Sequence, residues 1–111
     1  MLYIGDNNSI KLTRGDTAYV SVPITNDLTG NAYDLTEADK LTLTVKKRAT
    51  DTEALFKKTV IGSNDFHILP SDTSNLAFGK YLYDVQLETS NDDVYTVIAP
   101  SDFEVLKEVT W

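Results

Sequence analysis

A two-residue alternation of apolar and polar side chains runs through most of this chain, and it is clearest at residues 80–88, KYLYDVQLE. One parity of this segment holds Tyr81, Tyr83, Val85 and Leu87, and the other is mainly polar. Because successive side chains of a β-strand point to opposite faces, the pattern is typical of a strand with one buried face. The sequence therefore predicts a sheet protein.

Similar segments recur along the chain and are separated by turn residues. The predicted strands are residues 10–13, 18–25, 41–47, 54–61, 66–69, 80–88, 94–99 and 103–109. Seven or eight short strands at roughly 8–12-residue spacing predict an all-β, immunoglobulin-like antiparallel β-sandwich. The length of 111 residues predicts a single β-sandwich domain over residues 1–111.

Some local features are less regular. Pro23 cannot donate to a ladder and suggests a sheet edge or a bulge, and Pro100 is expected to break the chain between the last two strands. Thr36 and Asp39 have the spacing of a helix cap and predict one helical turn. In residues 54–61 the inward parity stays open between Leu55/Ile61 and Phe56/Val60.

The inward parities of the predicted strands give a candidate core. Its members are Val20, Val22, Leu41, Leu43, Val45, Phe66, Tyr83, Val85, Leu87, Val97 and Phe103. The chain has no cysteine, so the fold uses no disulfide and no thiolate metal site, which suits assembly in a reducing cytoplasm.

The net charge of −7 disfavours phosphate backbones and anionic membranes as partners, so neither nucleic acid nor membrane binding is expected. The first ten residues show no signal-peptide pattern, and no apolar run approaches the ~20 residues of a membrane span.

The tripeptide Arg14-Gly15-Asp16 is known as a cell-adhesion signal, but it lies between two predicted strands. Gly15 tolerates the positive φ that a tight turn needs, and Asp16 can hydrogen-bond nearby backbone. We therefore interpret the tripeptide as a turn.

Three motifs carry a resemblance to a known family. They are Gly15-Asp16-Thr17 at the start of a strand, Tyr33-Asp34-Leu35-Thr36 before another, and Gly79-Lys80-Tyr81-Leu82-Tyr83-Asp84 late in the chain. In this order and spacing, over nearly the whole chain, they resemble the immunoglobulin-like N-terminal module of phage and prophage baseplate upper proteins and related tail-associated proteins of Gram-positive bacteria.

The resemblance implies a non-enzymatic virion structural protein without cofactors, which is assembled in the bacterial cytoplasm and located in the tail or baseplate. Its expected partners are other tail or baseplate proteins or copies of itself. Tyr81 precedes Tyr83 where an immunoglobulin-like domain carries a tyrosine corner, so its hydroxyl is expected to bond upstream backbone at Asn75 or Leu76. The alternative is that Tyr81 only fills the core.

Candidate catalytic and metal sites are few. His67 is the only histidine, it lies in a short apolar strand, and no serine nucleophile motif accompanies it. Acidic turns at residues 5–8, 63–65 and 90–93 could bind Ca²⁺, but they lack a calcium-loop register and are equally typical of ordinary turns. We expect no catalytic, cofactor or metal site.

A basic cluster is the main candidate for a binding surface. Its members are Lys46, Lys47, Arg48, Lys57 and Lys58, on two neighbouring predicted strands. They could protect a sheet edge from unwanted pairing, or they could form an electrostatic docking patch for an acidic neighbour. Both interpretations stay open at this point.

Exposed aromatic side chains suggest an alternative function, a carbohydrate-binding module that recognises a host surface. The candidates are Tyr19, Tyr33, Tyr95 and Trp111. A sugar platform needs two or three such rings on one face, whereas these are scattered over different predicted elements.

Overall fold

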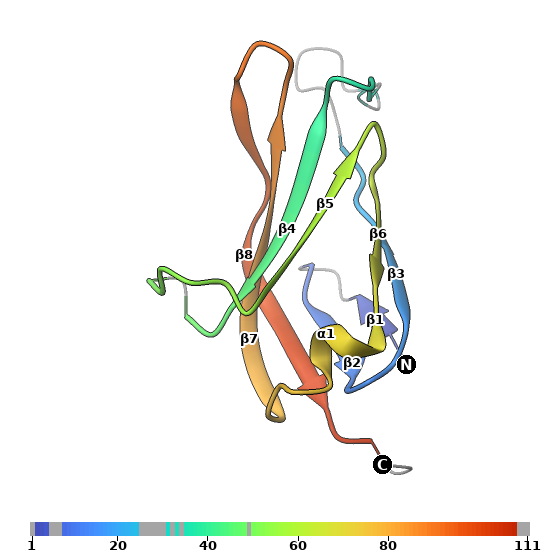
Figure 1. Ribbon diagram of the computed structural model, residues 1–111, viewed down its shortest axis with the longest axis vertical. Helices are drawn as coiled ribbons and strands as arrows, with labels where there is room; N and C mark the ends of the chain where they lie inside the picture. Colours follow the sequence, from blue (N-terminus) through green and yellow to red (C-terminus); the bar gives the residue numbers. More distant parts are fainter. Residues whose placement is uncertain are drawn as a thin grey trace.

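The alternation in the sequence produces two stacked β-sheets, which Figure 1 shows with β3 and β6 on one side of the longer strands. The computed structural model describes the backbone of residues 2–4 and, in full, residues 8–24, 31, 33, 35–48 and 50–108. The elements are β1 (Leu2–Ile4), β2 (Ile10–Thr13), β3 (Ala18–Ser21), β4 (Lys40–Lys46), β5 (Phe56–Ile61), β6 (Asp65–Ile68), α1 (Pro70–Thr73), β7 (Gly79–Glu88) and β8 (Val94–Leu106).

The strand order confirms an all-β sandwich. Six strands form a large sheet in the order β1-β2-β8-β7-β4-β5, and β3 pairs with β6 in a small sheet. The run β8-β7-β4-β5 has the order of strands G, F, C and C′ in a variable-type immunoglobulin sheet. Within the described part of the chain, no helix has the length and apolar character that crossing a membrane requires.

One strand pair departs from the expected antiparallel arrangement. β2 runs parallel to β8, with Ile10 opposite Phe103 and Leu12 opposite Val105. These strands lie at the two ends of the chain, so no hairpin forces them to run in opposite directions. The large sheet is therefore mixed.

The inner faces of the two sheets bury the core that the alternation predicted. All of the predicted core residues are buried except Val97, which is partly buried and packs against the others. The structure adds Ile10, Leu12, Ala18, Ile68, Tyr81 and Val105 to the buried set. In β5 it resolves the open parity, because Phe56 and Val60 pack against the core while Leu55 and Ile61 are exposed.

The sequence predicts a break at Pro100, but the last strand continues through this residue. β8 continues from Val94 to Leu106 because the register shifts where the proline lies. Tyr83 lies opposite Ser101 and Val85 opposite Ile98, so two residues of β8, one of them Pro100, face one residue of β7. Such a β-bulge leaves a residue outside the ladder, where the missing proline N–H costs little.

The other irregular segments are short. β3 ends at Ser21, before Pro23, and is an edge strand of the small sheet, as the proline suggested. Thr36 and Asp39 form a turn and not the expected helical turn; the Asp39 carboxylate accepts from the Thr36 N–H at 3.0 Å. The short helix α1 follows β6 and begins at Pro70.

We expect Leu43→Ala to lower the free energy of unfolding by about 2–4 kcal/mol, because it leaves a cavity between the sheets. Leu43 is 0% exposed, whereas Ile61 is 66% exposed on the opposite face. Ile61→Ala is therefore the matched control and should change stability by less than about 0.5 kcal/mol. Urea denaturation of both variants measures the difference, and equal effects would contradict the assignment of Leu43 to the core.

Candidate functional site

The Arg14-Gly15-Asp16 tripeptide forms the turn between β2 and β3. Gly15 has a φ of 81°, a left-handed conformation that favours glycine. The Asp16 N–H donates to the Thr13 carbonyl at 3.1 Å, and the Gly15 N–H donates to the buried Thr73 hydroxyl of α1 at 2.9 Å. The backbone of the tripeptide is thus fixed to the rest of the fold by hydrogen bonds.

The Arg14 side chain holds the end of the chain against this turn. Its Nη2 lies 2.6 Å from Glu108 Oε1, its Nε is 3.1 Å from Oε2, and its guanidinium carbon lies 4.2 Å from the centre of the Phe78 ring. The Glu108 side chain is only 7% exposed. Because the guanidinium is bound in this way, the tripeptide serves as a structural turn. Nothing in the local sequence indicated that Glu108 is the partner of Arg14.

This ion pair changes the acid–base behaviour of its carboxylate. The hydrogen bonds from Arg14 hold the pKa of Glu108 below its usual value, although desolvation opposes the shift. A depressed carboxyl pKa means that the folded chain binds protons less readily than the unfolded chain. The link between the β2–β3 turn and Glu108 therefore depends on pH.

Tyr81 makes the hydrogen bond of a tyrosine corner. Its hydroxyl donates to the Ala77 carbonyl at 2.7 Å, one residue beyond the expected partners Asn75 and Leu76. Tyr83, two residues along the same buried face, donates its hydroxyl to the Asn8 carbonyl at 2.5 Å, and burial raises the pKa of Tyr83 to about 12. Both tyrosines thus connect β7 to the backbone of other segments.

The basic cluster does not form one patch. Lys58 faces inward along β5, and its Nζ lies 2.6 Å from the Asp72 carboxylate of α1. Arg48 pairs with Asp51 in the β4–β5 loop at 3.6 Å, and Lys47 lies 5.8 Å from the centre of the Tyr81 ring. Three of the five predicted patch residues are therefore engaged within the molecule.

Lys46 and Lys57 share the outer face of the large sheet. Thr44 lies opposite Lys57 in the β4–β5 register, and Lys46 follows two residues later on the same face. Neither lysine makes an ion pair with any residue that the structure describes. We call these two residues the lysine pair.

The lysine pair borders a shallow, polar depression of about 230 Å³. The lining residues are Thr44, Lys46, Thr52, Lys57, Leu82, Tyr83, Asp84, Gln86 and Pro100. It lies beside the β-bulge of β8, and its hydroxyl, amide and ammonium groups can bind a polar or anionic group but show no arrangement for catalysis. No sequence pattern indicated this depression, because its walls come from four strands and the β4–β5 loop.

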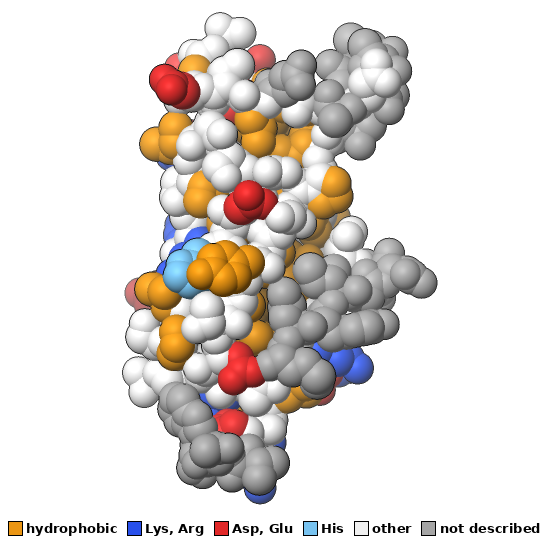
Figure 2. Space-filling view, turned by 90° about the vertical axis from the view of Figure 1, so that its right-hand side faces the viewer, with side chains coloured by type: hydrophobic (Ala, Val, Ile, Leu, Met, Phe, Trp, Pro, Cys, Tyr) orange, Lys and Arg blue, Asp and Glu red, His pale blue; other side chains and the backbone are white. Residues whose placement is uncertain are grey.

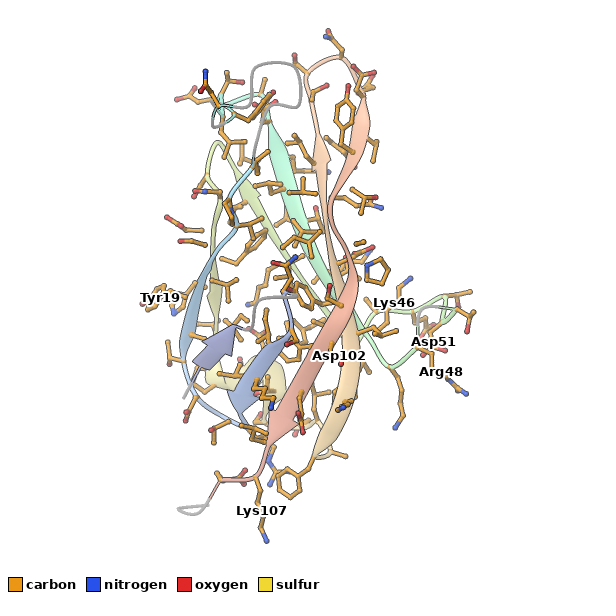
Figure 3. The ribbon with its side chains drawn as sticks, turned by 180° about the vertical axis from the view of Figure 1, so that it is seen from behind. Tyr19, Lys46, Arg48, Asp51, Asp102 and Lys107 are labelled. Atoms are coloured by element: carbon orange, nitrogen blue, oxygen red, sulfur yellow. The ribbon has the colours of Figure 1, made fainter. Side chains whose placement is uncertain are left out.

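Charges are separated across the same sheet face. Asp84 of β7 lies opposite Thr44, and Asp102 of β8 lies opposite Leu82, which itself lies opposite Lys46. Figure 3 shows Lys46 near the loop of Arg48 and Asp51, with Asp102 on β8, which is separated from β4 by β7. The β4–β5 side of the face is therefore basic, and the β7–β8 side is acidic.

A second exposed feature lies on the outer face of the small sheet. Tyr19 of β3 stacks on His67 of β6, with ring centres 4.4 Å apart and planes at 10°. Figure 2 shows the histidine beside an apolar side chain on this face. The two residues are directly opposite in the register, and Tyr19 is 69% exposed. The His67 side chain therefore points outward. The sequence alone did not predict its stacking on Tyr19, because this contact depends on the register of β3 and β6.

The other aromatic candidates are not gathered around Tyr19. Tyr33 is half-buried, and its hydroxyl donates to Asp39 at 3.4 Å; partial burial and the Asp39 charge raise the pKa of Tyr33. Tyr95 is exposed on β8, opposite Leu87 in the large sheet. Trp111 lies outside the described residues. The structure therefore brings Tyr19 together with His67 rather than with another tyrosine.

The acidic turns gather no metal-ligand cluster among the described residues. Residues 5–7 lie outside the described residues, and Asp65 accepts a hydrogen bond from Ser21. In the turn at residues 89–93, the Thr89 N–H donates to the Asp93 carbonyl. Among the residues that the structure describes, no three His, Asp or Glu side chains gather as metal ligands would.

Comparison of the sequence with known proteins adds no assignment. No protein-family model matches the chain, and no similar sequence is found among curated proteins.

Replacing Tyr81 by phenylalanine should lower the free energy of unfolding by about 1 kcal/mol, because the Ala77 carbonyl loses its donor. Tyr19→Phe removes the same hydroxyl from an exposed side chain and should change stability by less than about 0.5 kcal/mol. Thermal and urea unfolding measure both variants. Unchanged stability of the Tyr81 variant would mean that the residue only fills the core.

Glu108→Gln should weaken the acid sensitivity of the fold. Because the folded pKa of Glu108 is depressed, its contribution is present above the unfolded pKa of about 4.3 and is lost as pH falls through the folded pKa. The variant should thus be less stable than the parent at pH 6, and the difference should shrink as pH falls through the folded pKa of Glu108.

Urea titrations at successive pH values measure this convergence. The control is Glu88→Gln, because Glu88 and its partner Lys40 are both about half exposed and such a pair contributes little. A constant stability difference between parent and Glu108 variant at all pH values would contradict the role of the Arg14 ion pair.

Proposed function

We propose that this chain is a non-enzymatic structural protein of a phage or prophage tail or baseplate, acting through protein–protein contacts. Its partners are other tail or baseplate proteins or further copies of the chain. It is assembled in the bacterial cytoplasm and located in the virion. The proposal combines the resemblance of the three motifs with the chemistry of the exposed surface.

The lysine pair is the observation that carries the proposal. In a protein of net charge −7, Lys46 and Lys57 lie on one open sheet face without an ion-pair partner among the described residues. Positive groups exposed on an acidic molecule favour one orientation of approach for an acidic partner. Such a surface supports docking of a neighbouring protein.

The motifs that carry the resemblance support the same interpretation. Gly15 forms a turn, Thr36 is held by Asp39, and Tyr81 closes a corner. These residues maintain the shape of the module and leave its outer faces for contacts. In an assembly with repeated copies, several weak contacts act together and give strong overall attachment.

A second candidate function is binding of host-surface carbohydrate, and the Tyr19–His67 stack is the observation that favours it. Sugar rings commonly pack on exposed aromatic faces, and Tyr19 is 69% exposed. A glycan array with the protein and its Tyr19→Ala variant tests this function. Saccharide binding that is lost in the variant would place carbohydrate recognition ahead of assembly.

Antibody labelling of phage particles induced from the source bacterium tests the proposed location. Label at the tail tip or baseplate is the expected result. Purified particles without the protein would overturn the proposal.

A charge-reversed protein tests the lysine pair. Lys46→Glu combined with Lys57→Glu should reduce incorporation into particles at least tenfold, because attraction to an acidic neighbour becomes repulsion. The control is Lys107→Glu, since Lys107 is an exposed residue beyond the end of β8 (Figure 3). Quantitative blotting of purified particles measures incorporation, and equal amounts of both variants would exclude a role for the lysine pair.

A further inference from the structure

In the described part of the chain, the edge of the large sheet at β5 has no strand beside it. β5 is the last strand in the sheet order, and its one ladder among the described residues is with β4. Figure 1 shows β5 and β6 diverging from the hairpin that joins them. From this geometry we infer that β5 accepts an extended, acidic segment of a partner protein as an added strand.

The register shows which backbone groups of β5 are free. The Gly62 N–H donates to the Asp39 carbonyl at 2.9 Å, so residues 62 and 39 form a hydrogen-bonded pair. In an antiparallel ladder such pairs recur every second residue, so Phe56, Lys58 and Val60 bond to β4. The N–H and C=O groups of residues 57, 59 and 61 therefore point away from the sheet, as an added strand requires.

The side chains of the same three residues lie on the outer face. Lys57, Thr59 and Ile61 are exposed, whereas the residues between them are half-buried. A strand added beside β5 places its own outer-face side chains opposite this series, at about 5 Å. The matching chemistry is a carboxylate opposite Lys57, a small polar residue opposite Thr59 and an apolar residue opposite Ile61.

Charge decides which segment fits. Lys57 has no ion pair in the described part of the chain, and Lys46 borders the same depression. Lysines on an edge strand usually discourage pairing, but Lys58 is withdrawn from the edge by its ion pair with Asp72. The remaining Lys57 repels basic segments and attracts an acidic one.

The same series argues against a second copy of the chain as the occupant. Two β5 strands paired around a two-fold axis at Thr59 place Lys57 opposite Ile61 of the other copy. This arrangement leaves the lysine without a carboxylate, so an acidic segment of a different protein fits better. The inference rests on the proposed function, since it names how that docking surface receives its partner.

Amide hydrogen exchange, followed by NMR on the full chain, reads the added strand directly. The probe is the acetylated and amidated peptide Thr-Val-Ser-Thr-Ser-Glu-Thr, which in antiparallel register places its glutamate opposite Lys57 and its valine opposite Ile61. The control peptide carries lysine in place of glutamate. In the free protein, the amides of residues 57, 59 and 61 should exchange rapidly and those of residues 56, 58 and 60 slowly.

We expect millimolar glutamate peptide to slow exchange at residues 57, 59 and 61 at least fivefold, and the lysine peptide to have no such effect. Lys57→Glu should reverse this preference. Thr59→Pro should abolish protection by either peptide while β5 stays paired with β4, because the lost N–H faces away from the sheet. If the proline variant does not fold, the reversed preference of Lys57→Glu carries the test.

Two results would overturn the inference. The first is the absence of a peptide-specific effect: the glutamate peptide does not slow amide exchange at residues 57, 59 and 61, or both peptides slow it equally. The other is protection of residues 57, 59 and 61 in the protein alone that rises with its concentration, which would identify a second copy as the occupant. Either result leaves the proposed function standing if the protein is found in phage particles, because particle labelling does not depend on the mode of docking.

Discussion

The small sheet exists because its inner side chains are buried against the large sheet. A two-stranded sheet is marginal alone in water, and β3 and β6 have no further strand beside them in the described residues. Val20, Phe66 and Ile68 bury their side chains under the large sheet, and each such burial contributes about 1.5–3 kcal/mol. The outer stack of Tyr19 on His67 therefore depends on packing at the opposite face of the same strands.

Among the described residues, two ion pairs with little solvent exposure join separate elements of this sandwich. Arg14 connects the β2–β3 turn to Glu108, which follows β8, and Lys58 connects β5 to Asp72 of α1. Both pairs are largely shielded from solvent, so breaking one partner leaves a poorly solvated charge. A motif search would assign Arg14 to adhesion and Lys58 to docking. Because each is bound in an ion pair, neither charge is available to a partner protein.

The outer faces of the two sheets differ in chemistry. The outer face of the large sheet carries the lysine pair beside an acidic side and ends at the open edge of β5. The outer face of the small sheet carries an aromatic stack beside Asp65. Because these surfaces lie on different sheets, they share no residues.

The sequence by itself determined the strands other than β1, most of the core and the turn at Gly15, because alternation and turn chemistry are local properties of a chain. It also indicated the edge position of β3 through Pro23. Only the tertiary structure decided that β2 runs parallel to β8, that Pro100 sits in a bulge, and that Lys58 turns inward to Asp72. These outcomes depend on which distant segments become neighbours, and no local pattern records such pairings. For the same reason only two residues of the five-residue basic cluster lack an ion pair or ring contact among the described residues. The hydroxyl of Tyr81, by contrast, bonds to Ala77, one residue from the partners that local spacing predicted.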